Sequence, residues 1–458
     1  LPPDQIQAAT RPFIGQTLDA GGIQKLSDAL AAAYEHSDIA IYTVLVPDQD
    51  PSAGTLQVRV LEGRVEGVKI EVGSAGRAEK LMRRHADQLT REKPLRRSTL
   101  QREISLIRDI PGLSTDMQLL NGGAEDSVVV ELKPNLKPVQ FGFAVNNRGT
   151  AFLGRTQVQG DLYLNSFLRS GDQTRLTIAA PTDDDLFRFG ALSYVTPLGF
   201  NGDQLQFNGS YLETRPAGTA LEGHATSFGA QITRPVIRSF DKNLYVTLGV
   251  DGVNADNALF GTRFSDDRSR AGRLAVAWSR TLPKSVFVIV ASGSLGIDGL
   301  GARTTSPDFT ELDFKKANLR ISYARSLGDH FAVRLKAAGQ ISSDALPGSE
   351  QFALGGTEYG RAYESAVIAG DRGYAGSAEV AWRPNLPKLI GGSELYGFVD
   401  GGRTTFLSRS IYAQADYRLA SAGAGVRVSL ANKAVVEVEA ARGLSSNLAF
   451  LDDRDWRG

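Results

Sequence analysis

The sequence predicts an α+β region of about 135 residues, followed by an all-β, 16-stranded antiparallel barrel of the transmembrane type. Apolar residues at helical spacing, such as Leu26, Leu30 and Ala33, indicate the α+β region. From about residue 138 onward, apolar and polar residues alternate and helical periodicity disappears. The connections there are alternately short and long, which is typical of barrels in the bacterial outer membrane.

Composition excludes several classes of protein. The 458 residues carry 51 basic and 51 acidic side chains, so no basic excess points to a nucleic-acid partner. Cysteine is absent, which excludes a disulfide framework and any cysteine-ligated metal site. The best apolar run, 286–295, is shorter than the roughly 18 residues that a membrane-spanning helix needs.

The α+β region contains the same order of elements twice. A strand (65–72), two helices (77–89 and 98–110) and two strands (113–120 and 127–132) form a β-α-α-β-β unit. Before it come helices at 3–13 and 23–34 and strands at 39–46 and 55–61. We therefore expect domains at 1–66 and 67–135, the first without its opening strand, and a barrel at 136–458.

Fifteen alternating segments of about ten residues can be counted in the barrel region. A soluble sandwich also alternates, but fifteen segments are too many for one sandwich. The polar face of these segments is expected to line the inside of the barrel, and it carries Arg320, Arg334, Lys336, Arg427, Glu437 and Glu439. Because bacterial barrels have even strand numbers, we expect 453–458 to begin a sixteenth strand that continues past Gly458.

The connections between the segments fall into two groups. The short ones are 166–172, 197–203, 280–285, 325–330 and 429–433; the long ones are 213–226, 254–270, 299–312 and 343–371. If the N-terminal domains lie in the periplasm, loops after odd-numbered strands lie outside the cell. The glycine-rich loop 343–371 follows the eleventh segment and is therefore expected on the outer side.

Several short motifs, in their order along the chain, carry a family resemblance. They are Pro47, Gln49, Gly54, Leu56, Glu62 and Gly63; Asp109, Pro111 and Gly112; and the stretches 146–154, 370–374 and 398–402. In this order the chain resembles the two-partner secretion transporters of the haemolysin-activator and adhesin-secretion type. The resemblance covers essentially the whole chain and implies two POTRA domains, each β-α-α-β-β, followed by a 16-stranded barrel.

The loop 343–371 resembles the sixth loop of that family. Its motif here is Leu354-Gly355-Gly356, then Gly360-Arg361-Ala362-Tyr363. Ala362 stands where the family has glycine, and alanine adopts a positive φ less readily. The resemblance implies that Arg361 reaches into the barrel toward the aspartate of 398–402. Alternation independently places Asp400 and Phe398 on the inner face, so we expect an Arg361–Asp400 pair with Tyr363 and Phe398 packed beside it.

The resemblance implies an outer-membrane transporter with POTRA domains in the periplasm. Its partner would be an unfolded secreted exoprotein that the POTRA domains recognise, and the barrel would pass it to the cell surface without a cofactor, as a monomer in lipid. An alternative is a factor that assembles and inserts other outer-membrane proteins. A passive porin needs no POTRA domains. An enzyme is not indicated, since no catalytic motif is present and the four histidines show no metal-ligand spacing.

Two charged stretches leave alternatives open. Arg83, Arg84, Arg96 and Arg97 could bind an acidic segment of the substrate, or form a solvated helix surface balanced by acidic neighbours such as Glu79 and Glu92. The acidic turn 182–186 could bind a cation or could be a surface turn.

Overall fold

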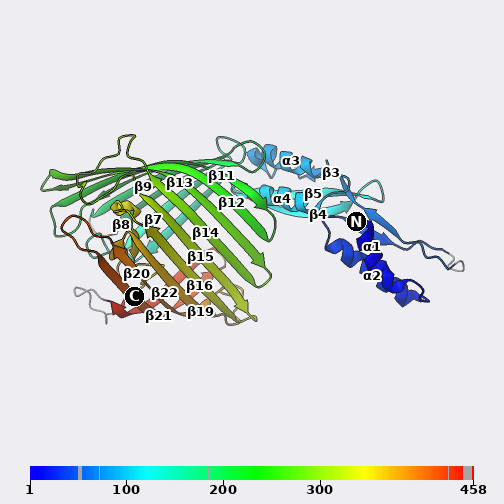
Figure 1. Ribbon diagram of the computed structural model, residues 1–458. Helices are drawn as coiled ribbons and strands as arrows, with labels where there is room; N and C mark the ends of the chain where they lie inside the picture. The colour runs from blue at the N-terminus through cyan, green and yellow to red at the C-terminus, as the bar shows by residue number, and fades with distance from the viewer. Residues whose placement is uncertain (50–53, 72, 183–184, 432, 447–455, 458) are drawn as a thin grey trace. The chain divides into compact units, whose positions relative to one another are not determined.

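The computed structural model describes residues 1–49, 54–71, 73–182, 185–431, 433–446 and 456–457. The chain separates into two compact units, which Figure 1 shows in ribbon form. The first comprises 1–139 with 165–173 and 238–240, and the second comprises the remaining residues from 140 to 458. In the described residues, no helix has the length and apolar character needed to cross a membrane.

The first half of unit one contains two helices and two strands. Helix α1 (Pro3–Thr10) continues into a 3-10 turn, η1 (Arg11–Phe13), and is followed by α2 (Ala20–Glu35). Strands β1 (Tyr42–Leu45) and β2 (Arg59–Glu62) form an antiparallel pair. Both strands are shorter than expected, and the predicted turn between them lies partly outside the described residues, at 50–53.

A hydrogen bond joins helix α2 to strand β2. The Tyr34 hydroxyl donates to Glu62 Oε1 at 2.9 Å. Burial, together with this carboxylate, raises the pKa of Tyr34 to about 12, so the phenol remains a donor at neutral pH. Glu62 belongs to one of the sequence motifs, and its contact with α2 is a structural role for it.

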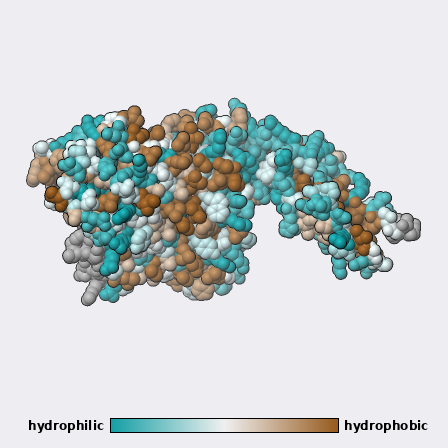
Figure 2. Space-filling view, viewed as in Figure 1, coloured by the Kyte–Doolittle hydropathy of each residue, from teal (hydrophilic) through white to brown (hydrophobic). Residues whose placement is uncertain are grey.

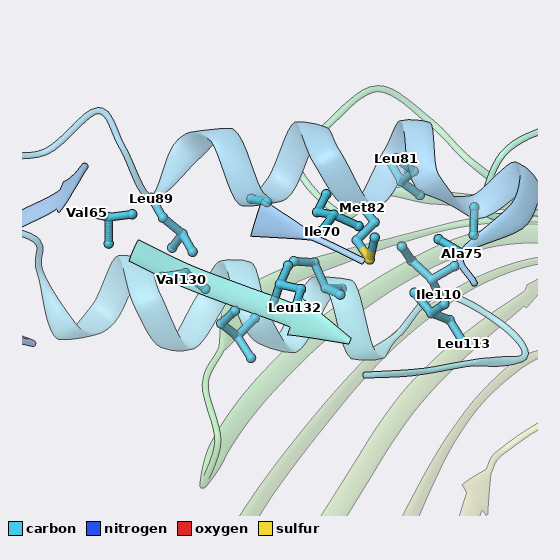
Figure 3. Packing of buried hydrophobic residues seen from close by; sticks show 14 of the residues in the cluster. Val65, Ile70, Ala75, Leu81, Met82, Leu89, Ile110, Leu113, Val130 and Leu132 are labelled. Carbon is cyan, nitrogen blue, oxygen red and sulfur yellow. The ribbon is translucent and has the colours of Figure 1, made fainter. Parts of the chain in front are cut away.

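The second half of unit one has the expected β-α-α-β-β order. Strand β3 (Arg64–Ile70) leads to η3 (Gly76–Ala78), α3 (Glu79–Gln88) and α4 (Arg97–Arg108), and then to β4 (Leu113–Asn121) and β5 (Ser127–Leu136). The sheet order is β3-β5-β4, with β3 parallel and β4 antiparallel to β5. Helices and sheet enclose one apolar core, in which Met82 of α3 packs with Val130 and Leu132 of β5 (Figure 3).

Unit two is built on one antiparallel sheet of sixteen strands among the described residues. They run in sequence order and are β6 (Val139–Asn146), β7 (Gln157–Asn165), β8 (Gln173–Pro181), β9 (Phe187–Pro197), β10 (Gln204–Thr214), β11 (Leu221–Arg238), β12 (Lys242–Leu259), β13 (Thr262–Leu282), β14 (Ser285–Gly296), β15 (Lys315–Leu327), β16 (Phe331–Ser342), β19 (Arg372–Trp382), β20 (Glu394–Phe406), β21 (Ala415–Leu430), β22 (Ala434–Ser446) and β23 (Trp456–Arg457). The sheet curves into a barrel (Figure 1). The expected sixteenth strand is represented by Trp456 and Arg457, which pair with β22, while 453–455 and 458 lie outside the described residues.

Residues on the two faces of the sheet differ as the alternation predicts. On β20, Leu395 and Val399 are exposed while Tyr396, Phe398 and Asp400 are buried. On β16, Leu335 and Ile341 are exposed, whereas Gln340 on the opposite face is buried. Apolar side chains gather over the visible outer surface of the strands (Figure 2). This pattern suits a barrel whose outer face contacts lipid.

One expected long loop is wrong. Residues 254–270 are mostly strand, because β12 and β13 continue as a long hairpin that turns at Phe260 and Gly261. Its charged side chains pair across the hairpin, as Asp256 does with Arg263. Such pairs stabilise strands that carry no apolar alternation, so alternation in the sequence does not reveal this hairpin. The loop expected at 213–226 is also shorter, since β10 ends at Thr214 and β11 begins at Leu221.

Replacing a core residue tests the packing of unit one. Leu132 is fully buried, so Leu132→Ala should lower the free energy of unfolding of this unit by about 2–5 kcal/mol. Pulse proteolysis of the whole protein in urea, following the loss of unit one, measures the change. Leu119→Ala on β4 is the matched control, because Leu119 is 49% exposed. Equal effects of the two changes would contradict the assigned core.

Candidate functional site

Residues 343–371, which we call the inner loop, connect β16 to β19. The loop contains a 3-10 turn, η4 (Gly348–Glu350), and two short strands that pair with each other, β17 (Phe352–Leu354) and β18 (Ile368–Gly370). Leu354, Tyr363 and Ile368 form a buried cluster with Ala375 of β19 and Leu419 of β21. Since Ala375 lies on the buried face of its strand, the loop packs against the inside of the barrel.

Glycines shape the tip of the inner loop. Gly355, Gly356 and Gly360 have φ values of 104°, 96° and 79°, which side chains rarely adopt. A Cβ on Gly360 would lie 2.4 Å from Leu419 Cδ1, so the backbone approaches the wall closely there. Ala362 is not among the residues with positive φ. Alanine at position 362 of the motif therefore does not need the positive φ that would strain a residue with a side chain.

The tip carries a buried arginine. Arg361 is only 6% exposed, and its Nη1 donates to Glu379 Oε2 at 3.2 Å and to Glu439 Oε2 at 3.0 Å. The guanidinium also lies over the Phe398 ring, 4.1 Å from the centroid. Residues from β19, β20 and β22 thus surround one cation that belongs to the loop.

Asp400 holds the backbone at the same place. Its Oδ1 accepts hydrogen bonds from the Gly360 amide at 2.7 Å and from the Ser421 hydroxyl at 2.5 Å. Its Oδ2 lies 3.5 Å from Arg361 Nε. Within the described part of the chain, neither Oδ2 nor Nε has a hydrogen-bond partner, although both are buried. The two charges attract each other, but this contact leaves hydrogen-bonding capacity unused.

The structure brings Arg361, Phe398 and Asp400 together and corrects two details. The hydrogen-bond partners of Arg361 are Glu379 and Glu439, whereas Asp400 makes only the longer contact. Tyr363 does not belong to the cluster of Phe398: it packs with Leu354 and Leu419, and its hydroxyl donates to the carbonyls of Ala420 and Ser445. Ala362, between them in sequence, packs against both clusters.

A wider ionic network surrounds the tip. Glu379 accepts from Arg334 and Arg427, and Glu394 accepts from the same two arginines. Glu437 accepts from Tyr396 and Arg427. Four of the six residues expected to line the barrel (Arg334, Arg427, Glu437 and Glu439) are in this network. Arg320 lies 3.5 Å from Glu358 of the inner loop, and Lys336 is an exposed residue on the same face as Arg334.

The network also reaches the segment that follows the first barrel strand. Arg148, two residues beyond β6, donates to Glu439 Oε1 at 2.8 Å. Arg457 of β23 donates to the Gly149 carbonyl at 2.9 Å. The segment after the first strand, β6, therefore contacts both β22 and the last strand, β23. Its contact with β22 is made to Glu439, which also binds Arg361 at the loop tip.

Glu350 attaches the loop to another part of the wall, at β13 and β15. Its carboxylate is buried and accepts from Arg273 of β13 at 2.7 and 3.1 Å, and Lys316 Nζ of β15 lies 2.8 Å away. Its carbonyl accepts from Lys316 and from Gln340. Both carboxylate oxygens and the carbonyl are thus hydrogen-bonded.

Asp371 attaches the other end of the loop. It is completely buried and pairs with Arg409 in the segment after β20. It also accepts from the amides of Leu346 and Leu407, at 2.9 and 2.8 Å. The inner loop is therefore fixed at three places, near its start, at its tip and at its end.

Sequence reasoning missed most of these partners. Glu379 could have been found, because it alternates with Ser377 and Ala381 on the buried face of β19. For Glu350 and Arg273 the sequence offers no signal, since their contact depends on where a loop without periodicity folds back. Asp371 lies in the motif 370–374, but the motif does not identify its partner Arg409.

The four arginines expected to bind substrate, Arg83, Arg84, Arg96 and Arg97, do not form one common set of contacts. Arg83 pairs with Glu79 one helical turn away, and Arg96 with Glu92. Arg97 donates to the carbonyls of Tyr34 and Ile39 and so joins the two halves of the unit. Arg84 has other contacts. These placements favour the interpretation as a balanced helix surface for Arg83 and Arg96, and a structural role for Arg97.

The acidic turn 182–186 is described only in part. Residues 183–184 of the acidic turn lie outside the described residues. Elsewhere in the part of the chain that the structure describes, no group of three or more histidine or acidic side chains is arranged to hold a metal ion.

The family follows from two models that match the chain. The model of the haemolysin secretion/activation protein ShlB/FhaC/HecB matches residues 125–428, and that of the ShlB-type POTRA domain matches 1–63. The chain belongs to this family. It is a two-partner secretion transporter of the outer membrane, with POTRA and barrel regions.

Relatives and solved structures agree with this assignment. The chain is 20% identical to the "Heme/hemopexin transporter protein HuxB" of Haemophilus influenzae, over 99% of this chain and 83% of the relative. It is 23% identical to the "Outer membrane transporter CdiB" of Dickeya dadantii, over 86% and 72%. The structure of CdiB from Escherichia coli matches with a TM-score of 0.79 at 19% identity, covering 100% of this chain and 86% of that one. BamA from Haemophilus ducreyi lacking POTRA domains 1–3 matches with a TM-score of 0.55 at 14% identity, covering 97% and 94%.

Labelling of a single cysteine tests how Arg361 holds the tip. The natural sequence has no cysteine, so Ala362→Cys gives one thiol at a partly buried position. Arg361→Ala should expose this thiol and raise its rate of reaction with a maleimide at least about tenfold, since breaking a buried pair costs about 3–5 kcal/mol. Arg320→Ala, which removes an exposed arginine that contacts the same loop, should leave the rate unchanged. Equal rates in all three proteins would refute the anchoring role of Arg361.

Proposed function

We propose that this transporter recognises an unfolded exoprotein through unit one, which we call the POTRA unit, in the periplasm and passes it through the barrel to the cell surface. The inner loop is the gate of that pathway. The observation that carries this proposal is the buried Arg361, which fixes a long loop inside the barrel with several wall carboxylates around it. A polypeptide cannot occupy the space that the loop fills, so the tip has to leave.

The POTRA unit suits the capture of an extended chain. Strand β4 lies at the edge of the β3-β5-β4 sheet, and its residues Leu119 and Leu120 are exposed. An edge strand offers unpaired backbone groups to an incoming strand, which gives affinity without demanding one sequence. This mode of binding fits a substrate that arrives unfolded.

The three attachments of the loop differ in strength. The carboxylate oxygens of Glu350 are hydrogen-bonded to fixed cations, and Asp371 accepts backbone amides in addition to Arg409. At the tip, two atoms, Arg361 Nε and Asp400 Oδ2, are buried without hydrogen bonds within the described part of the chain, whereas at the Asp371 attachment this holds for one atom, Arg409 Nε. A buried polar group without a partner costs about 1–3 kcal/mol, so the tip is the attachment most easily released. The glycines at 355, 356 and 360 supply the hinge.

The connectivity supports an outward direction of transport. Strand β6 continues from β5 of the POTRA unit, and the inner loop follows the eleventh strand of the sheet. With the POTRA unit in the periplasm and the barrel in outer-membrane lipid as a monomer, the loop is rooted on the outer side. The exoprotein would enter past the POTRA unit and leave past the released tip.

Assembly of other outer-membrane proteins is the competing function, because the BamA barrel shares the fold. The CdiB structure is more similar to this chain in fold, and the family model is one of secretion. Deleting the gene should remove one large secreted protein from the medium while other barrels remain at normal levels. A general loss of outer-membrane barrels would favour the assembly function.

Export by single variants tests the gate. Arg361→Ala and Asp400→Ala should each leave the barrel in the membrane but reduce export of the exoprotein at least about tenfold, because a misplaced tip no longer sets the resting state of the pathway. Measurement is by the amount of exoprotein in the medium, with barrel levels in the outer-membrane fraction as the check on folding.

The matched control for export is Arg320→Ala, which removes a 69% exposed side chain near the same loop. It should export normally. Full export by both Arg361→Ala and Asp400→Ala would contradict the gating role.

A further inference from the structure

A groove lies on the outer face of the sheet, away from the inner loop. Its volume is about 570 Å³, within the roughly 300–1,000 Å³ range of ligand pockets. It crosses β15, β16, β19 and β20, and its lining includes Ala317, Leu319, Gly339, Ile341 and Tyr374. Leu319, Ile341 and Tyr374 are 44%, 70% and 63% exposed, so these side chains face outward.

Small residues make the surface hollow. Leu319, Gly339 and Tyr374 are direct cross-strand partners on three successive strands. Gly339, in the middle of this row, contributes no side chain, and a Cβ there would meet only the Gly373 carbonyl, at 3.7 Å. Ala317 pairs with Ile341 in the next row. The hollow is therefore apolar and bordered by larger side chains, as an acyl chain requires.

Arginines border the groove on one side. Arg403 pairs across the strands with Tyr374 and with Arg418, so all three lie on the outward face. Arg372 pairs with Thr405 in the neighbouring row, beside Asp416. Asp416 lies 2.7 Å from Arg403 and offsets one of the three charges. The three arginines are exposed, and basic side chains outnumber acidic ones among these four residues.

The position of the cluster decides which molecule it meets. The groove lies where β15 begins and β16 ends and where β19 begins and β20 ends, which is the side of the sheet that carries the inner loop. In the orientation proposed above, on which this step rests, that side is the outer leaflet. Guanidinium groups bind phosphate through paired hydrogen bonds. The groove beside them is apolar, so the ligand needs an apolar part as well as a phosphate, and a soluble anion lacks one.

We infer that this surface binds a phosphorylated, multiply acylated glycolipid of the lipid A class. One acyl chain would lie in the groove over Gly339, and a phosphate would lie between Arg372, Arg403 and Arg418. The site would hold one lipid in a fixed position against the strands that flank the inner loop.

Native mass spectrometry of the purified protein in detergent tests this inference, with lipid A and phosphatidylglycerol as probes. The triple variant Arg372→Gln, Arg403→Gln and Arg418→Gln should bind lipid A at least about tenfold more weakly than the natural protein. Gly339→Leu, which fills the groove without changing charge, should also weaken binding. Arg280→Gln with Arg325→Gln, at exposed outward positions near the opposite ends of β13 and β15, is the matched control and should bind normally.

Unchanged lipid A binding in the triple variant would overturn the site, and so would equal binding of phosphatidylglycerol and lipid A by the natural protein. Because binding is measured on purified protein, the result does not depend on export. A protein that exports normally and fails to bind lipid A would refute this inference alone, whereas a protein that binds lipid A and exports nothing would refute the proposed function alone.

Discussion

The interior of the barrel depends on the cost of burying one guanidinium group. Arg361 is taken out of water at the tip of a loop, and a buried cation requires charged or hydrogen-bonding partners. Glu379, Asp400 and Glu439 on three different strands supply them. Each of these carboxylates is itself buried, so none can lose its cationic or amide donors without a penalty. The position of the loop tip therefore depends on the carboxylates of the wall, and these carboxylates in turn depend on the loop tip for part of their hydrogen bonding.

The same carboxylates connect the loop tip to other parts of the barrel. Glu439 accepts from Arg361 of the loop and from Arg148 beyond the first strand. Release of the tip would remove one of the two cations that stabilise Glu439 and leave Arg148 and Tyr396 as its donors. The loop and the meeting place of the first and last strands are thus coupled through a single carboxylate. The ends of the loop, held by Glu350 and Asp371, do not share this carboxylate.

Alternation in the sequence was enough to find the strands and to place Asp400 and Phe398 on the inner face. It failed at 254–270, where charged residues stabilise a hairpin that has no apolar face. It predicted that Arg361 lies near Asp400 but could not identify Glu379 and Glu439 as its hydrogen-bond partners. The depth of a loop tip is set by the packing of Leu354 and Tyr363, and loop residues have no periodicity from which this packing can be read. The acidic neighbours Glu79 and Glu92 of Arg83 and Arg96 are visible in the sequence, whereas the structural role of Arg97 depends on Tyr34, which is distant in sequence.

Locking the loop in place tests the central claim most directly, that the tip must leave its site during export. Glu358 and Arg320 are exposed, lie 3.5 Å apart and take no part in the buried network, and the chain has no other thiol once both are changed to cysteine. After a bifunctional thiol reagent has joined Glu358→Cys to Arg320→Cys, export should stop. Cleaving the linker should restore it, while either single cysteine variant exports normally throughout. Undiminished export by a fully cross-linked protein would show that the exoprotein passes with the tip in place, and would contradict the account.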